Sequence, residues 1–243
     1  FIGGRSGNRG RCAQPCRQLY SDFSGKKSTY AMSMKDMCTL QDIPAICEAG
    51  IDSLKIEGRM KKPEYVAAVV NAYRQAVDMY AEGSWSSLEV DALTDEMRDI
   101  YNRGGFSDGY YYEQKGSDML SLYRPNHEGL GVGYVEKAVP PKIYIRLEKA
   151  VNAGDVLEIR GKENVELTVG AGQEKAAGDV LVLNGKDFGK ISVKSRVNRT
   201  RNNALITRLH EEIIDPEKKV AVRAKVEALE GQPLKIIISD LNC

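Results

Sequence analysis

The stretch IDSLKIEGRMKKPEYVAAVV, residues 51–70, contains the transition on which the fold class depends. Its first part, Ile51–Ile56, follows a glycine that can end a helix and is interpreted as a strand. Pro63 stands where a helix can begin, and apolar residues then recur at helical spacing as far as Tyr80. The stretch therefore predicts a strand, a charged turn and a long helix.

The residues before this stretch show the same order of elements. Thr29–Met34 predicts a strand, and a helix follows it through Leu40 and Cys47 and ends at Gly50. A strand-helix-strand-helix order indicates parallel strands joined by right-handed crossovers. Two strands are too few for a parallel sheet that is covered on both faces. Residues 1–82 are therefore predicted to form the last β/α units of a TIM-like barrel, and the chain is expected to be a piece of a longer protein.

The rest of the chain predicts a linker and a β domain, so the fold class is α/β plus β. Residues 83–126 contain an acidic helix, Leu88–Tyr101, interpreted as a solvated surface helix, and a connector rich in Gly and Tyr. Residues 127–201 predict a small antiparallel β-barrel, and residues 202–243 a helix and a hairpin that begins a further unit. The barrel strands are expected at Gly131–Glu136, Ile143–Leu147, Val156–Ile159, Val165–Val169, Val180–Leu183 and Lys190–Val197.

Composition excludes several classes of protein. The sequence has 35 Lys and Arg against 34 Asp and Glu, a net charge of +1, so a nucleic acid would have to be held by a local basic patch. No apolar run approaches the roughly 20 residues that a membrane span requires. A cytoplasmic protein that does not bind membranes is therefore expected, and the oligomeric state stays open.

Four of the five cysteines lie near the start of the sequence: Cys47, which is expected to belong to the core, and three candidate ligands, Cys12, Cys16 and Cys38. Cys12 and Cys16 belong to a loop rich in Gly and Arg, where guanidinium charge favours the thiolate that metals bind. Zinc and iron–sulfur centres use four ligands, so three thiols are an incomplete set. On spacing alone, the favoured alternative is that Cys12 and Cys16 are free loop thiols and Cys38 a small buried side chain.

Two groups of charged residues are candidates for substrate contacts. Lys55, Glu57 and Arg59 follow a predicted strand, at the barrel edge where substrates bind. Arg59 can hold a phosphate or carboxylate and Glu57 can accept a proton, or the two form only an ion pair. Lys194 and Arg196 are alternate residues of the last predicted strand, so they would share a face and present positive charge to RNA, or to solvent alone.

The two histidines give little sign of hydrolytic chemistry. His127 lies at a predicted domain junction, where a hydrogen-bonding role is expected, and His210 lies on a predicted helix and is expected to be exposed. No Ser/His/Asp, Cys/His or His-Glu-x-x-His arrangement is visible. The sequence therefore offers no evident hydrolase motif.

Several long motifs carry a family resemblance. GGRSGNRGRCAQPCR at 3–17, MKDMC at 34–38 and SLKIEGRMKKPEYV at 53–66 closely resemble the U32 peptidase family, also called collagenase-like proteases. The resemblance is strong to about residue 80, and NRGGFS at 102–107 with RPNHEG at 124–129 resembles the linker of longer members. It implies a TIM-like barrel followed by a small barrel similar to that of translation elongation factors.

The resemblance also implies a cofactor. Members of the family include proteins implicated in hydroxylating a tRNA uridine or a ribosomal RNA cytidine. Others hydroxylate ubiquinone and carry a four-iron four-sulfur cluster on four cysteines. Carried over to this sequence, Cys12 and Cys38 match two of the ligands, and Cys16 is a conceivable substitute. The other two would come from a C-x6-C signature, which is expected upstream of Phe1.

The leading hypothesis is an iron–sulfur enzyme that hydroxylates a base of tRNA or rRNA. Catalytic roles are assigned to Lys55, Glu57 and Arg59, and substrate contacts to Arg5, Asn8, Arg9, Lys194 and Arg196. The family's name favours a peptidase that acts on collagen-like or other peptides as the alternative. A third hypothesis is a module that binds RNA or the ribosome without catalysis, so whether the chain is an enzyme stays open.

Overall fold

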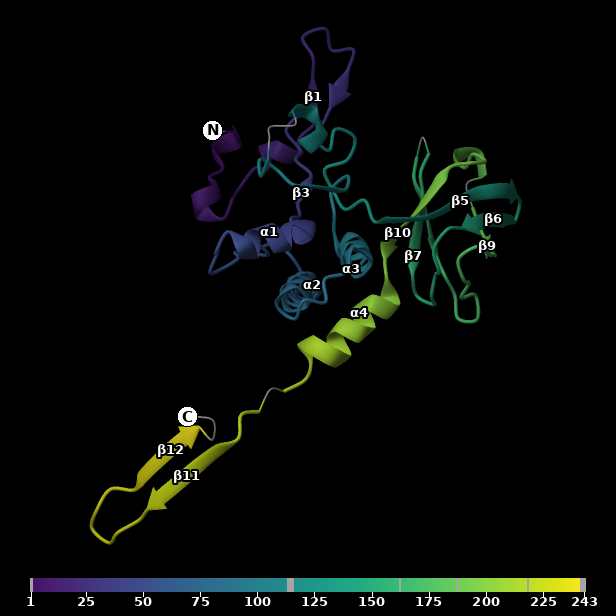
Figure 1. Ribbon diagram of the computed structural model, residues 1–243. Coiled ribbons are helices and arrows are strands. Elements are labelled where there is room, and N and C mark those ends of the chain that lie inside the picture. The colour runs from purple at the N-terminus through teal and green to yellow at the C-terminus, as the bar shows by residue number, and fades with distance from the viewer. Residues whose placement is uncertain (1, 113–115, 162, 187, 218, 241–243) are drawn as a thin grey trace.

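The computed structural model describes residues 2–112, 116–161, 163–186, 188–217 and 219–240 (Figure 1). They form a mixed α/β fold, in which a helical part is followed by a curled six-stranded antiparallel sheet, called the half-barrel below. A last helix returns toward the helical part, and a two-stranded hairpin projects beyond it. Within these residues, none of the helices combines the length and apolar character that a membrane crossing demands.

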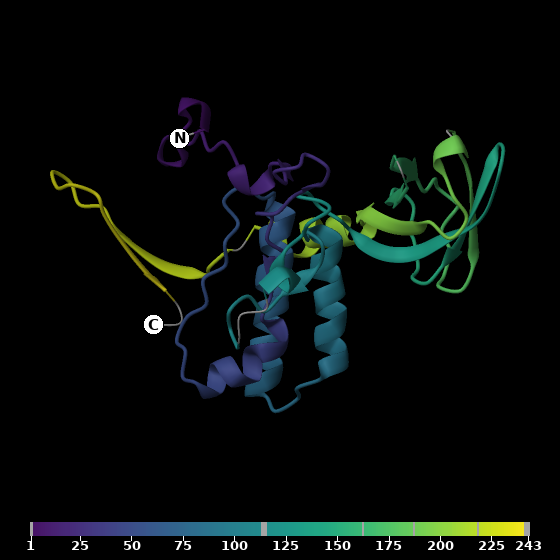
Figure 2. The same cartoon turned by 90° about the horizontal axis from the view of Figure 1, so that it is seen from above.

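The helical part contains the helices predicted from periodicity. They are α1 (Ile43–Glu48), preceded by a 3-10 turn at Leu40–Asp42, α2 (Pro63–Ala81) and α3 (Ser87–Ile100). Pro63 begins α2, and the Ser86 hydroxyl accepts a hydrogen bond from the Glu89 amide at the start of α3. Helices α2 and α3 lie side by side (Figure 2) and bury their apolar faces together with α1. Local sequence signals thus place these helices correctly.

The predicted parallel strands of this part do not form. Ile51–Ile56 has no regular structure, and Ile51 and Leu54 are 54% and 39% exposed. A strand in a parallel sheet needs neighbours, and no described strand lies beside this segment. Of the strand predicted at Thr29–Met34, only Thr29 belongs to a strand and Met34 to an isolated bridge with Leu120, so the barrel units are not confirmed. The short strands of this part are β1 (Tyr20–Ser21) antiparallel to β2 (Ser28–Thr29), and β3 (Asp36–Met37) parallel to β4 (Phe106–Ser107).

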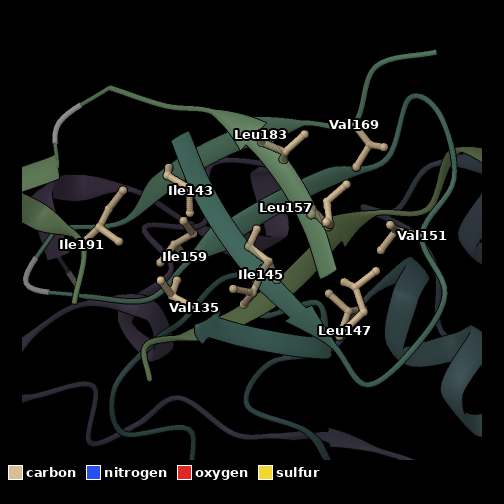
Figure 3. Packing of buried hydrophobic residues seen from close by; sticks show 13 residues of the cluster. Val135, Ile143, Ile145, Leu147, Val151, Leu157, Ile159, Val169, Leu183 and Ile191 are labelled. Carbon is tan, nitrogen blue, oxygen red and sulfur yellow. The ribbon is translucent and has the colours of Figure 1, made fainter. Parts of the chain in front are cut away.

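The half-barrel follows the predicted alternation of strands and turns. Its strands pair in the order β8-β7-β10-β5-β6-β9. They are β5 (Leu130–Val139), β6 (Lys142–Leu147), β7 (Val156–Ile159), β8 (Val165–Thr168), β9 (Val180–Asn184) and β10 (Arg196–Arg201). In β6, Ile143, Ile145 and Leu147 are buried in the core (Figure 3), and they alternate with residues that are only partly buried. A bulge in the pairing of β5 with β6, between Val135 and Lys137, bends the sheet around this core.

The last strand is displaced from its predicted position. Lys190–Val197 was expected, but β10 begins at Arg196, because Lys194 has a φ of +68° and belongs to a turn. Lys194 and Arg196 therefore do not share a strand face, which corrects the predicted basic stripe. Arg196 forms an ion pair with Glu148 at 3.1 Å, and Lys194 is exposed.

The acidic helix α3 was expected to be a solvated surface helix, and this expectation is wrong for most of its length. Its inner face is buried, and Asp95, Glu96 and Asp99 pair with residues of the half-barrel and α4, whereas Glu89 and Asp91 are exposed, as expected. Asp99 receives two hydrogen bonds from Arg199 of β10, at 2.9 and 2.5 Å, and Asp95 pairs with Lys149 at 2.6 Å. Arg199 also bonds Asp155 at 3.2 Å, and all three side chains of this network are less than a tenth exposed. The network joins the helical part to the half-barrel.

Helix α4 (Asn203–Leu209), continued by a π-helical turn (His210–Ile214), confirms the predicted helix. It packs Leu205 and Leu209 against Ala67 and Ala68 of α2. The chain therefore passes from the helical part into the half-barrel and back. The predicted hairpin is also present, as β11 (Val222–Glu227) and β12 (Lys235–Asp240), and projects from the molecule (Figures 1 and 2).

Candidate functional site

A pocket of about 500 Å³ opens where the helical part, the half-barrel and α4 meet. Its walls are formed by the N-terminal segment at Arg17, the start of α2 at Lys61, the end of α3 at Tyr101, the junction residue His127 and the end of β10 at Arg201. We call it the corner pocket. Because α4 and the Arg199 network hold these elements together, the pocket is part of the packed fold.

The corner pocket is lined by four cations: Arg17, Lys61, Lys62 and Arg201. Among the described residues, no carboxylate oxygen lies within 4 Å of any of them. The two acidic residues of the lining have partners of their own, since Asp99 is bound by Arg199 and Glu64 lies 3.3 Å from His210. The unpaired cations therefore favour an anionic ligand.

Aromatic rings form one side of the same pocket. The rings of Tyr101 and His127 are stacked, with centres 5.4 Å apart and planes at 14°. Tyr65 meets Tyr101 edge-on at 6.2 Å. The Nζ atom of Lys61 lies 2.7 Å from the centre of the Tyr101 ring. Rings and cations in one concavity are the elements that single-stranded nucleic-acid sites use.

Lys61 is the most perturbed group of the pocket. Its pKa is lowered from 10.5 to about 8, mainly by burial, with Asp36 opposing the shift and the nearby Arg103 and Arg17 adding to it. The Asp36 carboxylate is paired with Arg103, from which it accepts three hydrogen bonds, at 2.8, 3.3 and 2.9 Å. Lys61 thus carries a partly desolvated charge that lies over the Tyr101 ring and 5.3 Å from the centre of the Tyr65 ring.

His127 has the junction role predicted for it. Its Nδ1 accepts hydrogen bonds from the amides of Asn102 and Gly129, at 3.1 and 3.4 Å. In the neutral ring the proton must then reside on Nε2. Burial lowers the pKa of His127, which favours this neutral form. Nε2 is buried and has no hydrogen-bond partner among the described residues.

Glu64, at the start of α2, contributes an unsatisfied acceptor. Its Oε1 lies 3.3 Å from Nε2 of His210, whereas Oε2 is buried without a partner in the described part of the chain. Its own backbone amide, followed by His210, lowers the pKa of Glu64 and keeps it ionised. His210, which was expected to be exposed, is 37% exposed at its side chain and lies between Glu64 and Asp215.

The predicted catalytic residues lie outside the corner pocket. Lys55, Glu57 and Arg59 are exposed in the segment that was expected to be a strand. The Arg59 amide donates to Glu57 Oε1 at 2.9 Å, and this bond lowers the pKa of Glu57. The structure does not gather the three side chains around a concave site, and their catalytic role stays a prediction.

The predicted substrate contacts of the N-terminal segment are dispersed in the same way. Arg5 donates to two backbone carbonyls of its own loop, at 3.1 and 3.0 Å, so it stabilises the loop. Asn8 and Arg9 are exposed in a 3-10 turn, Gly7–Arg9. Further along the segment, Gln14 and Arg17 line the pocket. Contacts of Arg5, Asn8 and Arg9 with substrate therefore stay predictions.

The three cysteines do not by themselves fit a four-iron four-sulfur cluster. Cys12 and Cys16 are exposed, whereas Cys38 is half-buried against the α2 core. Burial raises the pKa of the Cys38 thiol, which disfavours the thiolate that a metal requires. Among the described residues, no three His, Cys, Asp or Glu side chains gather as a metal site would require. Their role as ligands stays a prediction.

Sequence reasoning missed most of the pocket residues. Lys61, Lys62 and Arg17 belong to the motifs that resemble the family, but their sequence context does not distinguish them from ordinary charged loop residues, which are common and usually solvated. The spacing of Lys61 to Tyr65, one helical turn, was the available signal. Tyr101 and Arg201 are separated from these residues by long stretches of chain, so no local pattern could have joined them.

Comparison with known proteins identifies the relatives of the chain. Residues 1–121 match the sequence profile of Peptidase family U32. The chain is 32% identical to a collagenase of Porphyromonas gingivalis over 167 residues, 64% of this chain and 46% of the relative. It is 32% identical to tRNA hydroxylation protein P1 of Bacillus subtilis over 175 residues, 65% of this chain and 41% of the relative.

A third relative modifies ribosomal RNA according to its name. It is a 23S rRNA 5-hydroxycytidine synthase of Escherichia coli, 31% identical over 173 residues, 67% of this chain and 26% of the relative. The chain spans less than half the length of these relatives. No solved structure matches it. The motifs around Cys12, Cys38 and Lys61 all lie within the matched residues, and the chain belongs to peptidase family U32.

Proposed function

We propose that this protein takes part in the hydroxylation of a base in tRNA or ribosomal RNA, in the cytoplasm, and that the corner pocket contacts the RNA. The observation that carries the proposal is the grouping of four cations, none paired with a carboxylate of the described residues, and a Tyr101–His127 stack in one concavity. Phosphates are attracted by such cations, and bases stack on such rings. Relatives named for tRNA hydroxylation and 23S rRNA 5-hydroxycytidine synthesis support the choice of RNA.

The residues of this chain are assigned to binding and orienting RNA. Arg17, Lys62 and Arg201 would hold phosphate groups, because each is a cation without a carboxylate partner among the described residues. We take the half-barrel to be an elongation-factor-like barrel and the helical part to be the end of a TIM-like barrel. The half-barrel would then hold Arg201 next to the helical part. No residue of the corner pocket is assigned to the hydroxylation step itself.

The test is the nucleoside content of cells that lack the protein. Deletion of its gene in the natural host should remove a hydroxylated pyrimidine nucleoside from tRNA or rRNA, as measured by mass spectrometry of digested RNA. The intact gene should restore the nucleoside, and a gene carrying Lys61→Met with Arg201→Glu should not. If deletion leaves every hydroxylated nucleoside unchanged, the proposal is wrong.

The relatives named collagenase favour a second candidate function, peptide hydrolysis, because one of them is 38% identical over 125 residues. Purified protein would then cleave gelatin, and cleavage should persist in Cys12→Ser and Cys38→Ser variants, which lack the predicted cluster ligands. Absence of cleavage by protein that binds RNA would exclude this candidate.

A further inference from the structure

The corner pocket contains a charge that does not benefit folding. Lys61 is partly buried, its pKa is lowered, and no carboxylate lies within 4 Å of it among the described residues. Burial of an unpaired ammonium destabilises a fold. Such an arrangement is expected where a ligand supplies the missing opposite charge. The position of Lys61 over the face of Tyr101 also shows where that ligand would enter.

Two further atoms of the lining residues lack partners within the described structure. They are the Nε2–H of His127, a donor, and Oε2 of Glu64, an acceptor. Buried polar groups are nearly always hydrogen-bonded, so each unsatisfied one calls for an explanation. A base edge carries both donors and acceptors, and it can satisfy the two atoms after the side-chain rotations that commonly accompany binding.

The size of the pocket limits the ligand to a single nucleotide. About 500 Å³ is within the range of sites that bind one small ligand. A base pair with its two backbones does not fit, whereas one nucleotide turned out of a single strand does. Its phosphate is matched by Arg17, Lys62 and Arg201, and its base by Tyr101.

We propose that the corner pocket binds one unpaired nucleotide of the RNA, with its phosphate on the pocket cations and its base on the Tyr101 ring. The phosphate draws Lys61 away from the ring and frees the face on which the base then stacks. The proposal rests on the proposed function for the identity of the polymer. It deepens that function by specifying single-stranded RNA and a one-nucleotide site.

The test is the binding of labelled hexauridylate to the full chain, measured by fluorescence anisotropy. Lys61→Met and Tyr101→Leu should each weaken binding roughly tenfold, the scale of one lost stacking or phosphate contact. Lys61→Arg should restore binding, which a merely structural role of Lys61 would not predict. Lys27→Met and Tyr110→Leu are matched controls, because both side chains are exposed and neither lines the pocket.

A duplex RNA of the same length is the second probe, and thermal unfolding confirms that each variant is folded. Hexauridylate binding that is unchanged in both pocket variants, or a duplex that binds as tightly as hexauridylate, would overturn the proposal. These outcomes are independent of the nucleoside measurement in cells. If deletion removes the hydroxylated nucleoside while pocket variants bind normally, only the pocket assignment fails. If pocket variants lose binding while the nucleoside persists after deletion, only the hydroxylation role fails.

Discussion

Two charged side chains at the same junction, Arg199 and Lys61, differ in whether carboxylates of the described residues pair with them. Arg199 is buried and bonded to two carboxylates, Asp99 and Asp155. Lys61 is partly buried, has no such partner in the described structure, and lies on an aromatic ring. The first arrangement satisfies every charge internally and connects two parts of the molecule. The second leaves the Lys61 ammonium available to an anionic ligand. The junction therefore contains one charged group that stabilises the fold and one that can bind a ligand.

The largest expected effect comes from breaking the satisfied network. Asp99→Ala removes the carboxylate that receives two bonds from Arg199 and leaves a buried guanidinium without its main partner. Breaking a buried pair in this way costs about 3–5 kcal/mol. The free energy of unfolding, measured by denaturant titration, should fall by that amount, and the two parts should unfold in separate steps.

The exposed pair of Arg74 and Asp78 on α2 provides the control. Both side chains are more than half exposed, and their ion pair joins residues one helical turn apart. Asp78→Ala should change stability by less than about 1 kcal/mol. If Asp99→Ala is no more costly than Asp78→Ala, the Arg199 network does not hold the junction together.

The same contrast explains which features could be predicted from sequence. Helix α2 begins at Pro63 and repeats its apolar residues at helical spacing, which is local information. Ile51–Ile56 looked like a strand, but strand formation depends on neighbouring strands, which a local pattern does not reveal. Asp99 looked like part of a solvated helix because its partner, Arg199, lies 100 residues later.

The half-barrel and the pocket also differ in how far local sequence predicts them. The strands of the half-barrel were predicted because burial alternates along each one, as at Ile143 and Ile145. The displaced start of β10 depended on a turn at Lys194, a residue type that gives no warning of positive φ. The pocket unites Arg17, Lys61 and residues of later segments, so it could be found only once the chain was folded.

Removing the unsatisfied charge is expected to stabilise the protein. Lys61→Met deletes an ammonium whose pKa is lowered from 10.5 to about 8, mainly by burial, with Arg17 and Arg103 adding to the shift and Asp36 opposing it. Because the folded pKa is below the unfolded one, the cost of burying the charge is fully present below pH 8 and disappears as pH rises toward 10.5. The melting temperature of Lys61→Met should therefore exceed that of the wild type at neutral pH, and the difference should shrink in alkaline buffer.

The adjacent Lys62 supplies the control for that measurement. It is exposed, so Lys62→Met should alter the free energy of unfolding by no more than about 0.5 kcal/mol at either pH. A Lys61→Met variant that is less stable than the wild type would show that the ammonium contributes to folding, and the contrast with Arg199 would then be lost.

The smallest expected effect concerns His210. It is intermediate between Arg199 and Lys61, because it is partly exposed but paired with Glu64 and Asp215. Asp215, followed by Glu64, raises the pKa of His210 above its usual 6.5. A raised folded pKa means that the stabilisation is fully present below 6.5 and is lost as pH rises through the folded value. His210→Gln should therefore lower the melting temperature slightly in weakly acidic buffer and leave it unchanged in weakly alkaline buffer. An equal loss at both pH values would mean that His210 acts through packing on α2, and that charge pairing at the junction is confined to the Arg199 network and its neighbours.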